Sequence, residues 1–246
     1  MRIYNIMKYY KVSFALSGAI ILLGLIMLVL NGFNLGIDFT GGTMLQIEIG
    51  KEVSVDEITD LIAEFNLSPE IIHSGLEKSE VIIKTKASLD SAQRDEVFEK
   101  FKTTYSLEDS AFKSSEQFGP SMGKEIRNRA FIAILLASAM MLVYITVRFE
   151  IVFGVAAIIA LLHDVLILVA IYAIFGITVN STFIAAILTV IGYSINDTIV
   201  VFDRIRENVK REKTKDHIEI VNISVTQTMT RTINTGMATL FVIVTL

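Results

Sequence analysis

The sequence predicts a polytopic α-helical membrane protein that carries one small α+β domain. Its mean hydropathy is +0.58 and 52% of its 246 residues are hydrophobic, which is too apolar for an ordinary soluble domain. Several apolar runs approach the roughly 20 residues that a membrane-spanning helix needs. One long polar stretch with strand and helix periodicities separates the first of these runs from the others.

Composition also excludes several functions. A net charge of −4 gives no basic surface for nucleic acid, so we expect no nucleic-acid partner. The chain has no Cys, which excludes disulfides and thiolate metal sites. The sequence contains no recognisable nucleophile–base set, metal-ligand cluster or nucleotide-binding loop. We therefore expect neither an enzyme nor a protein with a metal or cofactor.

Apolar runs predict four complete membrane spans after a short N-terminal segment, 1–11. The spans cover residues 12–30, 129–147, 151–175 and 182–202. A fifth run, 233–246, is too short to cross a bilayer, so we expect it to be the cut-off start of another span. Basic residues before the first run would also fit a cleaved signal peptide. The length of that run and its lack of a small-x-small cleavage site favour an uncleaved anchor.

Lysine and arginine residues indicate the orientation of the spans. They gather in the N-terminal tail, in the turn 147–150 and in segment 203–232, and the positive-inside rule assigns these three parts to the cytoplasm. Segment 31–128 is then extracytoplasmic. Residues 203–232 carry both signs of charge, which indicates an amphipathic interfacial helix or a solvated loop. We expect this segment mainly to set the topology.

Residues 43–117 predict a compact α+β domain. Alternating or continuous apolar patterns predict strands at 43–50, 70–75, 80–86 and 109–118, and helical spacing predicts helices at 54–65 and 89–105. Ser54 and Glu57 have the spacing of a capping box, and Ser88 or Asp90 caps the second helix. The order βαββαβ is that of a ferredoxin-like split βαβ unit.

A carboxylate interrupts the fourth predicted span, where Asp197 follows Asn196 in "VIGYSINDTIVVF". An ionisable group inside the bilayer is costly, so it indicates a functional site. Helical spacing puts Thr189, Tyr193 and Asp197 in one row, on a polar face suited to packing against other helices. We favour a role in proton handling. The alternative is a static ion pair that holds helices together.

A second carboxylate, Asp164, follows His163 near the middle of the third predicted span. Histidine titrates near neutral pH, so the pair could relay protons. Hydrogen bonding between helices explains the two residues equally well. Arg231 begins the fifth run, and from that segment alone a snorkelling interfacial anchor is the simpler interpretation. The functional alternative for Arg231 is a counter-ion for Asp197.

Two glycine-containing motifs flank the polar domain, "GIDFTGG" at 36–42 and "GPSMGKEI" at 119–126. Glycines permit tight turns and close backbone approach, so both motifs are predicted to be hinges between the domain and the spans. A phosphate cradle is disfavoured, because no helix is predicted after "GGT" and no Gly-Lys-Ser/Thr follows. The residues assigned to these hinges are Gly36, Asp38, Gly41, Gly42, Gly119 and Gly123.

Together the motifs resemble the SecD/SecF family of bacterial protein-export subunits, over essentially the whole chain. The resemblance rests on "GIDFTGG", "GPSMGKEIRNRA", "HDV", "GYSINDTIVVFDRIREN" and "RTINT". The short polar domain is similar to that of the SecF branch, because SecD members carry a much larger one. The resemblance implies one RND-like half, with six spans in the complete family member, that pairs with SecD in the bacterial cytoplasmic membrane.

The resemblance also implies a function and a set of site residues. The family works with the SecYEG translocon and uses the proton-motive force to promote translocation and release of exported unfolded polypeptide. Membrane lipid surrounds its helices. The family's membrane Asp and Arg correspond to Asp197 and Arg231, and with Asn196 and Asp164 they form the expected proton-conducting set. Two alternatives remain open, an RND-type exporter half for small molecules and a passive scaffold of the translocon.

Overall fold

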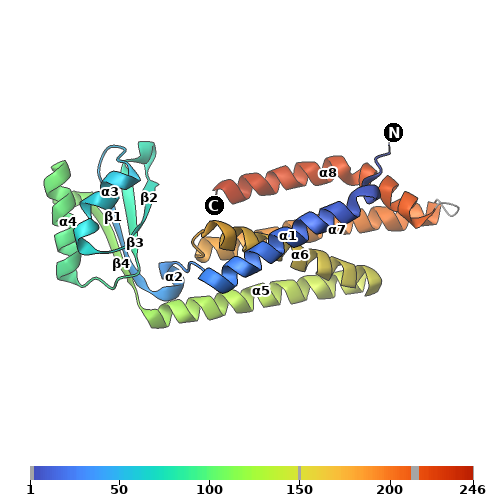
Figure 1. Cartoon of the computed structure of the whole chain (residues 1–246), viewed down its shortest axis with the longest axis horizontal. Helices are drawn as coiled ribbons and strands as arrows, with labels where there is room; N and C mark the ends of the chain where they lie inside the picture. The colour runs from blue at the N-terminus through green and yellow to red at the C-terminus, as the bar shows by residue number, and fades with distance from the viewer. Residues whose placement is uncertain (1–2, 149–150, 212–215, 246) are drawn as a thin grey trace. The chain divides into compact units, whose positions relative to one another are not determined.

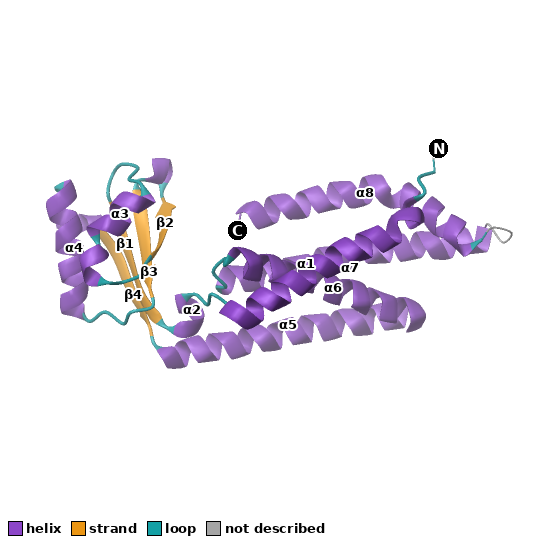
Figure 2. Cartoon of the chain, viewed as in Figure 1, coloured by secondary structure: helices purple, strands orange, loops and turns teal. Residues whose placement is uncertain are grey.

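The computed structural model describes residues 3–148, 151–211 and 216–245, and these fall into two compact units. Unit 1, the helical unit, contains residues 1–34 and 130–246, and unit 2, the α+β domain, contains residues 35–129. Figures 1 and 2 show the helices of the first unit and the sheet of the second.

Five long helices include the predicted spans. They are α1 (Tyr10–Asn31, preceded by the 3-10 helix η1, Ile6–Tyr9), α5 (Pro120–Arg148), α6 (Ile151–Phe175), α7 (Ser181–Arg211) and α8 (His217–Thr245). The described residues contain four helices that are long and apolar enough to cross a membrane: Ile6–Asn31, α5, α6 and α7. The prediction of a polytopic α-helical membrane protein is confirmed.

The contact between α1 and α6 depends on two small residues. Gly24 is the buried residue of α1, and Ala170 of α6 is 2% exposed. A Cβ atom added to Gly24 would lie 2.3 Å from the Ala170 Cβ atom. Small residues allow helices in a membrane to approach closely, and here no larger side chain fits without moving a helix.

Residues 203–211 and 217–232 form the adjoining ends of two helices in this structure. α7 continues to Arg211, and α8 begins at His217 and runs through the rest of the segment without a break. The two helices are neighbours that run in opposite directions (Figure 1). Parts of four predicted segments lie outside the described residues: 1–2 of the N-terminal tail, 149–150 of the turn, 212–215 of segment 203–232 and 246 of the fifth run.

The α+β domain has the predicted order of elements. After the short helix α2 (Ile37–Thr40) come β1 (Gly42–Glu48), α3 (Val55–Leu61), η2 (Ala63–Phe65), β2 (Glu70–Ser74), η3 (Leu76–Lys78), β3 (Glu80–Thr85), α4 (Ser91–Tyr105), η4 (Asp109–Ala111) and β4 (Phe112–Phe118). The sheet has the order β2-β3-β1-β4 and every neighbouring pair is antiparallel. This arrangement confirms the ferredoxin-like split βαβ prediction.

Alternation along the central strands builds the core of this domain. Leu45 and Ile47 of β1 and Val81 and Ile83 of β3 are buried, while the residues between them are partly exposed. These side chains pack with apolar residues of α3 and α4, including Phe101, which is fully buried. The two helices therefore cover one face of the sheet (Figure 2).

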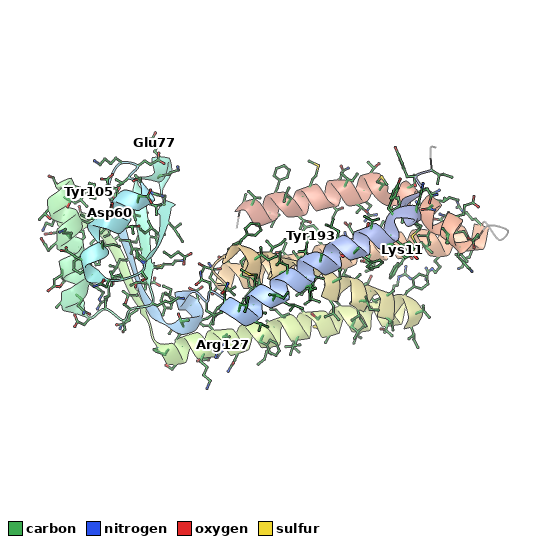
Figure 3. All side chains as sticks on the ribbon, in the orientation of Figure 1. Lys11, Asp60, Glu77, Tyr105, Arg127 and Tyr193 are labelled. Atoms are coloured by element: carbon green, nitrogen blue, oxygen red, sulfur yellow. The ribbon has the colours of Figure 1, made fainter. Side chains whose placement is uncertain are left out.

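The helix caps of the domain differ in one respect from the expectation. Asp90 caps α4 with a complete capping box, which decides between Ser88 and Asp90. Ser54 caps α3 by accepting a hydrogen bond from the backbone of Glu57. The Glu57 carboxylate, however, accepts a hydrogen bond of 2.9 Å from the Tyr105 hydroxyl group. Tyr105 is the last residue of α4 and is labelled in Figure 3. The predicted box is therefore half formed, because a tertiary contact uses its acidic side chain.

The two glycine motifs meet in a closely packed junction within unit 2. Gly41 and Gly42 have positive φ angles of 84° and 149°. A Cβ atom on Gly41 would lie 2.9 Å from the Phe118 carbonyl oxygen, and one on Gly123 would lie 2.8 Å from the backbone of Phe39. Glycine is thus required for backbone conformation and for close approach at this junction. The hinge role of the motifs stays a prediction.

Candidate functional site

Asp197 lies on α7 at the side that faces α8. Its side chain is half-buried, and its Oδ1 atom is buried without a hydrogen-bond partner among the described residues. A buried carboxylate oxygen with no donor is costly to keep ionised, since water no longer solvates it. Among the described residues, it is the one buried side-chain nitrogen or oxygen atom that lacks a hydrogen-bond partner.

Two residues of α8 act on the Asp197 carboxylate. Thr235 acts through its side-chain hydroxyl group, and Arg231 acts through its charge. The Thr235 hydroxyl group also lies 3.0 Å from the carbonyl oxygen of Arg231, one turn earlier in the helix. A hydroxyl group has one proton to donate, so Thr235 can satisfy one of these two acceptors at a time. Asp197 and Arg231 therefore lie near each other on two neighbouring helices, without an ion pair within 4 Å among the described contacts.

Asp164 occupies a different interface, between α6 and α7. Its Oδ2 atom accepts a hydrogen bond of 2.6 Å from Ser194 of α7, and its Oδ1 atom lies 3.1 Å from the His163 Nδ1 atom. Asp164 thus makes an interhelical hydrogen bond and also lies beside His163, so both interpretations of these two residues stay open. Ser194, which donates to Asp164, precedes Asp197 by about one turn of α7. The Asp164 carboxylate therefore contacts α7 about one turn away from the Asp197 carboxylate.

The four predicted site residues lie in three different places in the structure. Asp197 and Arg231 meet between α7 and α8, while Asp164 bonds to α7 from α6. Asn196 is exposed on α7, and no described contact joins it to either group. Sequence reasoning gave Ser194 no role. Its position as a polar residue inside an apolar run was the available signal.

A polar cluster fixes α7 and α8 to each other beyond the Asp197 region. The Asn208 Nδ2 atom donates to the Ser224 Oγ atom and to the Gln227 Oε1 atom, both at 2.9 Å. Asn208 is 4% exposed and Ser224 is fully buried. Ser224 donates its own proton to the Ile220 carbonyl oxygen, so all of these bonds form together. The cluster holds the register of the two helices that carry Asp197 and Arg231.

The N-terminal segment adds a second fixed point on α8, which we call the N-terminal latch. The backbone N–H groups of Tyr4 and Met7 donate to side-chain oxygens of Thr226 and Asn222, at 3.1 and 2.9 Å. The Asn222 amide group also donates to Asn5 at 3.3 Å. The latch and the polar cluster both hold the first half of α8. The second half, which carries Arg231 and Thr235, is more exposed.

Chemically, this arrangement is suited to binding and releasing a proton. It combines a buried carboxylate oxygen, a cation and a hydroxyl group on two adjacent helices. Protonation of Asp197 would remove its charge and leave Arg231 without an opposite partner at this point. Within residues 3–148, 151–211 and 216–245, no group of three metal-ligating side chains is found.

The family models and the relatives that match this chain point to the same family. Residues 97–246 match the family model for protein export membrane protein SecD/SecF, C-terminal, and residues 26–53 match that for the SecD/SecF GG motif. Protein translocase subunit SecF of Thermobaculum terrenum is 39% identical over 259 residues, which cover 98% of this chain and 82% of the relative.

Two relatives are longer chains. Protein translocase subunit SecDF of Bacillus subtilis is 36% identical over 239 residues, which cover 96% of this chain and 32% of the relative. The crystal structure of SecDF, a translocon-associated membrane protein from Thermus thermophilus, matches with a TM-score of 0.79 and 34% identity. That match covers 97% of this chain and 33% of the solved chain. The chain thus spans about a third of each SecDF chain.

Proposed function

Because the chain belongs to the SecD/SecF family and is a subunit of the Sec protein-export system, we propose that it couples the proton-motive force to export. It does so together with SecD and the SecYEG translocon in the bacterial cytoplasmic membrane. Pairing with SecD is supported by SecDF of Bacillus subtilis, whose name joins both subunits in one chain. The substrate is an exported unfolded polypeptide, and its translocation and release are the output.

The observation that carries the proposal is the unpartnered carboxylate oxygen of Asp197 beside Arg231 and Thr235. Ionised Asp197 attracts Arg231 and accepts from Thr235. Protonated Asp197 does neither as strongly, and the Thr235 proton returns to the Arg231 carbonyl oxygen. The packing of the second half of α8 against α7 then alternates between two states. Asp164, hydrogen-bonded to Ser194, and Asn196 belong to the same proton-conducting set.

The energy available is sufficient for such a switch. One charge that crosses the membrane gains about 2.3 kcal/mol per 100 mV. Moving a two-state equilibrium from 1:99 to 99:1 takes about 5.5 kcal/mol, so about three charges at about 100 mV are enough. The glycine motifs around α2 transmit the change to the α+β domain. That domain lies on the extracytoplasmic side and binds the emerging polypeptide, while the N-terminus and the α7–α8 connection are cytoplasmic.

The test is export into inverted membrane vesicles that contain the full-length protein and its SecD partner, with and without an imposed proton gradient. Asp197→Asn keeps the size of the side chain and removes its titration. We expect the gradient-dependent part of export to disappear while the gradient-independent part remains. Co-purification with SecD checks that the complex still assembles.

A swap variant is the matched control. Asn196→Asp combined with Asp197→Asn keeps one carboxylate at the same depth, but moves it about 100° around α7, away from Arg231. We expect this variant to behave like Asp197→Asn. Gradient-dependent export at the wild-type level in Asp197→Asn would instead show that the carboxylate is structural and favour the passive scaffold.

A further inference from the structure

An apolar crevice of about 400 Å³ lies beside the start of α1, and we call it the α1–α6 crevice. Most of its lining comes from one face of η1 and α1, where the residues recur at helical spacing, and α6 adds His163. The residues on the face of η1 and α1 are Ile6, Met7, Tyr10, Ser13, Phe14 and Ser17.

The crevice runs from the end of a membrane span into its interior. Gly24 of α1 meets Ala170 of α6, and Ser17 and His163 precede these two residues by seven positions each, about two helical turns. From Tyr10 to Ser17 the crevice is about 10 Å long. Because Tyr10 lies near the start of the first span, its end of the crevice is close to the membrane surface and the Ser17 end lies within the hydrocarbon.

The two serines do not make the crevice polar. The Ser13 hydroxyl group donates to the Tyr9 carbonyl oxygen at 3.3 Å, and the Ser17 hydroxyl group donates to the Phe14 carbonyl oxygen at 3.4 Å. A hydroxyl group that donates to its own helix has no proton left to donate to a ligand. The lining is therefore suited to a hydrocarbon chain.

The size of the crevice fits such a chain better than another protein helix. A volume of about 400 Å³ over a length of about 10 Å gives a mean cross-section of about 40 Å². An α-helix is about 10–12 Å across with its side chains, so it needs about 80–110 Å². A lipid acyl chain is the thin apolar occupant that a membrane supplies.

Two lysines at the surface end of the crevice are suited to an anionic head group. The Lys11 Nζ atom lies 5.9 Å from the centre of the Tyr10 ring, which lines the crevice, and the Lys8 Nζ atom lies 5.8 Å from the centre of the Tyr9 ring. Figure 3 labels Lys11 near the N-terminal end of α1. Tyrosines at this depth are typical of the membrane–water interface.

The charges of these lysines are not neutralised within the chain. The ion pairs among the described residues include neither Lys8 nor Lys11. The end of α7 differs, because Arg204, Arg206 and Arg211 each lie within 3.3 Å of an acidic side chain of the same helix. An anion from outside the chain therefore finds uncompensated positive charge beside the crevice.

The N-terminal latch holds one wall of the crevice in place. Its hydrogen bonds fix Tyr4, Asn5 and Met7 on α8, and Met7 also lines the crevice. A ligand that binds a preformed site loses less free energy in ordering that site.

We propose that the α1–α6 crevice binds one anionic phospholipid, with an acyl chain along the Tyr10–Ser17 face and the phosphate group near Lys8 and Lys11. Basic pockets between transmembrane helices bind anionic head groups in this way. The bound lipid adds contacts between α1 and α6 beyond the one at Gly24. The proposal is independent of the proton-coupled function, since a passive scaffold would hold the same lipid.

Native mass spectrometry of the full-length protein with its SecD partner tests the site, because it counts the lipids that stay bound. The purified complex is stripped of lipid in detergent and titrated with dioleoyl phosphatidylglycerol or with zwitterionic dioleoyl phosphatidylcholine. We expect one phosphatidylglycerol to bind roughly tenfold or more tightly than phosphatidylcholine. Equal affinities for the two lipids would overturn the proposal.

Charge variants locate the head group. Lys8→Gln combined with Lys11→Gln should weaken binding of the tight phosphatidylglycerol roughly tenfold. The matched control is Lys210→Gln combined with Arg211→Gln, which removes the same charge from exposed positions at the end of α7, outside the crevice. We expect this control to bind like the wild type. Equal weakening in both double variants would show attraction by overall charge and would overturn the site.

A filling variant locates the acyl chain. Ser17→Phe places a ring in the crevice, and Leu16→Phe, at an exposed position outside the lining, is its control. Phosphatidylglycerol should raise the unfolding temperature of the wild type and of Leu16→Phe, but not that of Ser17→Phe, because a ligand of the folded state stabilises it. A tight lipid retained in Ser17→Phe would overturn the proposal. Loss of SecD from Ser17→Phe with an unchanged lipid count would assign the crevice to a helix of the partner instead.

Discussion

At the scale of single residues, Tyr105 has a pKa that its surroundings change strongly. Partial burial at the end of α4, and then the hydrogen bond to the Glu57 carboxylate, raise the pKa of this phenol to about 12. Both causes favour the neutral phenol, because a phenolate would lose solvation and face a nearby negative charge.

This shift predicts a loss of stability in strong alkali. The unfolded phenol releases its proton near pH 10, while the folded one keeps it to about pH 12. Stability from this group is present below pH 10 and declines as the pH rises through about 12, because the unfolded state then binds fewer protons. We expect Tyr105→Phe to remove this part of the pH dependence. Thermal unfolding of wild type and Tyr105→Phe between pH 9 and 12 measures it, and identical pH profiles would contradict it.

The residue scale also shows what the sequence can and cannot predict. Asp197 and Asp164 are detectable because charges are rare inside apolar runs. The partners Ser194 and Thr235 are not, because a pair across two helices depends on the rotation of each helix. Glu57 in the α+β domain is a second example. Its spacing from Ser54 predicts a capping-box hydrogen bond, but its carboxylate accepts a hydrogen bond from Tyr105 of another helix.

At the scale of elements, the contact of α1 with α6 at Gly24 has no room for an added Cβ atom. We expect Gly24→Ala to destabilise the helical unit by about 1–3 kcal/mol, as in other overpacked interiors. Gly18→Ala on the same helix is the matched control, because nothing lies within 4 Å of its added Cβ atom. Thermal unfolding of the detergent-purified protein compares the two variants. A Gly24→Ala protein as stable as Gly18→Ala would show that α1 and α6 adjust without loss.

The polar cluster between α7 and α8 gives a second prediction. Asn208→Asp keeps the shape of the side chain but replaces its Nδ2 donor with a carboxylate oxygen, which faces the Ser224 and Gln227 oxygens without a proton to donate. Loss of these bonds in a buried site should lower the free energy of unfolding by about 1–3 kcal/mol or more. Unfolding at neutral and at acidic pH measures this. A protonated carboxyl group regains one donor, so acid should restore part of the loss. An undisturbed Asn208→Asp protein at neutral pH would contradict the proposed role of the cluster.

Element boundaries were less predictable than element types. Alternation and helical spacing identify the strands and both helices of the α+β domain, because one face of each packs on a single core. For residues 203–232 the sequence left a helix and a loop open, because charged residues continue a helix as well as they form a loop when another helix packs beside them. Asn208 and Ser224, both buried within that segment, join the two helices by a hydrogen bond that the sequence pattern alone does not predict.

At the scale of the whole molecule, the chain has two structural units, and the α+β domain has its own hydrophobic core. Phe101→Ala should destabilise this domain by about 3–5 kcal/mol, because the residue is fully buried in that core. A small domain has only about 5–15 kcal/mol of stability in total.

The expected result is selective proteolysis within residues 35–129, while the helical unit stays in the membrane and remains associated with SecD. Protease treatment of membranes followed by co-purification measures both parts. Met122→Ala, at an exposed position in α5, is the control for a general effect of truncating an apolar side chain. Cleavage throughout the chain in Phe101→Ala would show that the helical unit depends on the core of the α+β domain.

The N-terminal latch has a consequence for the order of biogenesis. Its hydrogen bonds join residues that are 215, 217 and 222 positions apart in the chain. At a synthesis rate of about 5–20 residues per second, roughly 10–45 seconds pass between the emergence of the two sides. During that interval α1 is already made and can pair with α6, but its leading segment has no partner. The latch therefore closes late and marks the moment at which α8 has joined the helices inserted before it.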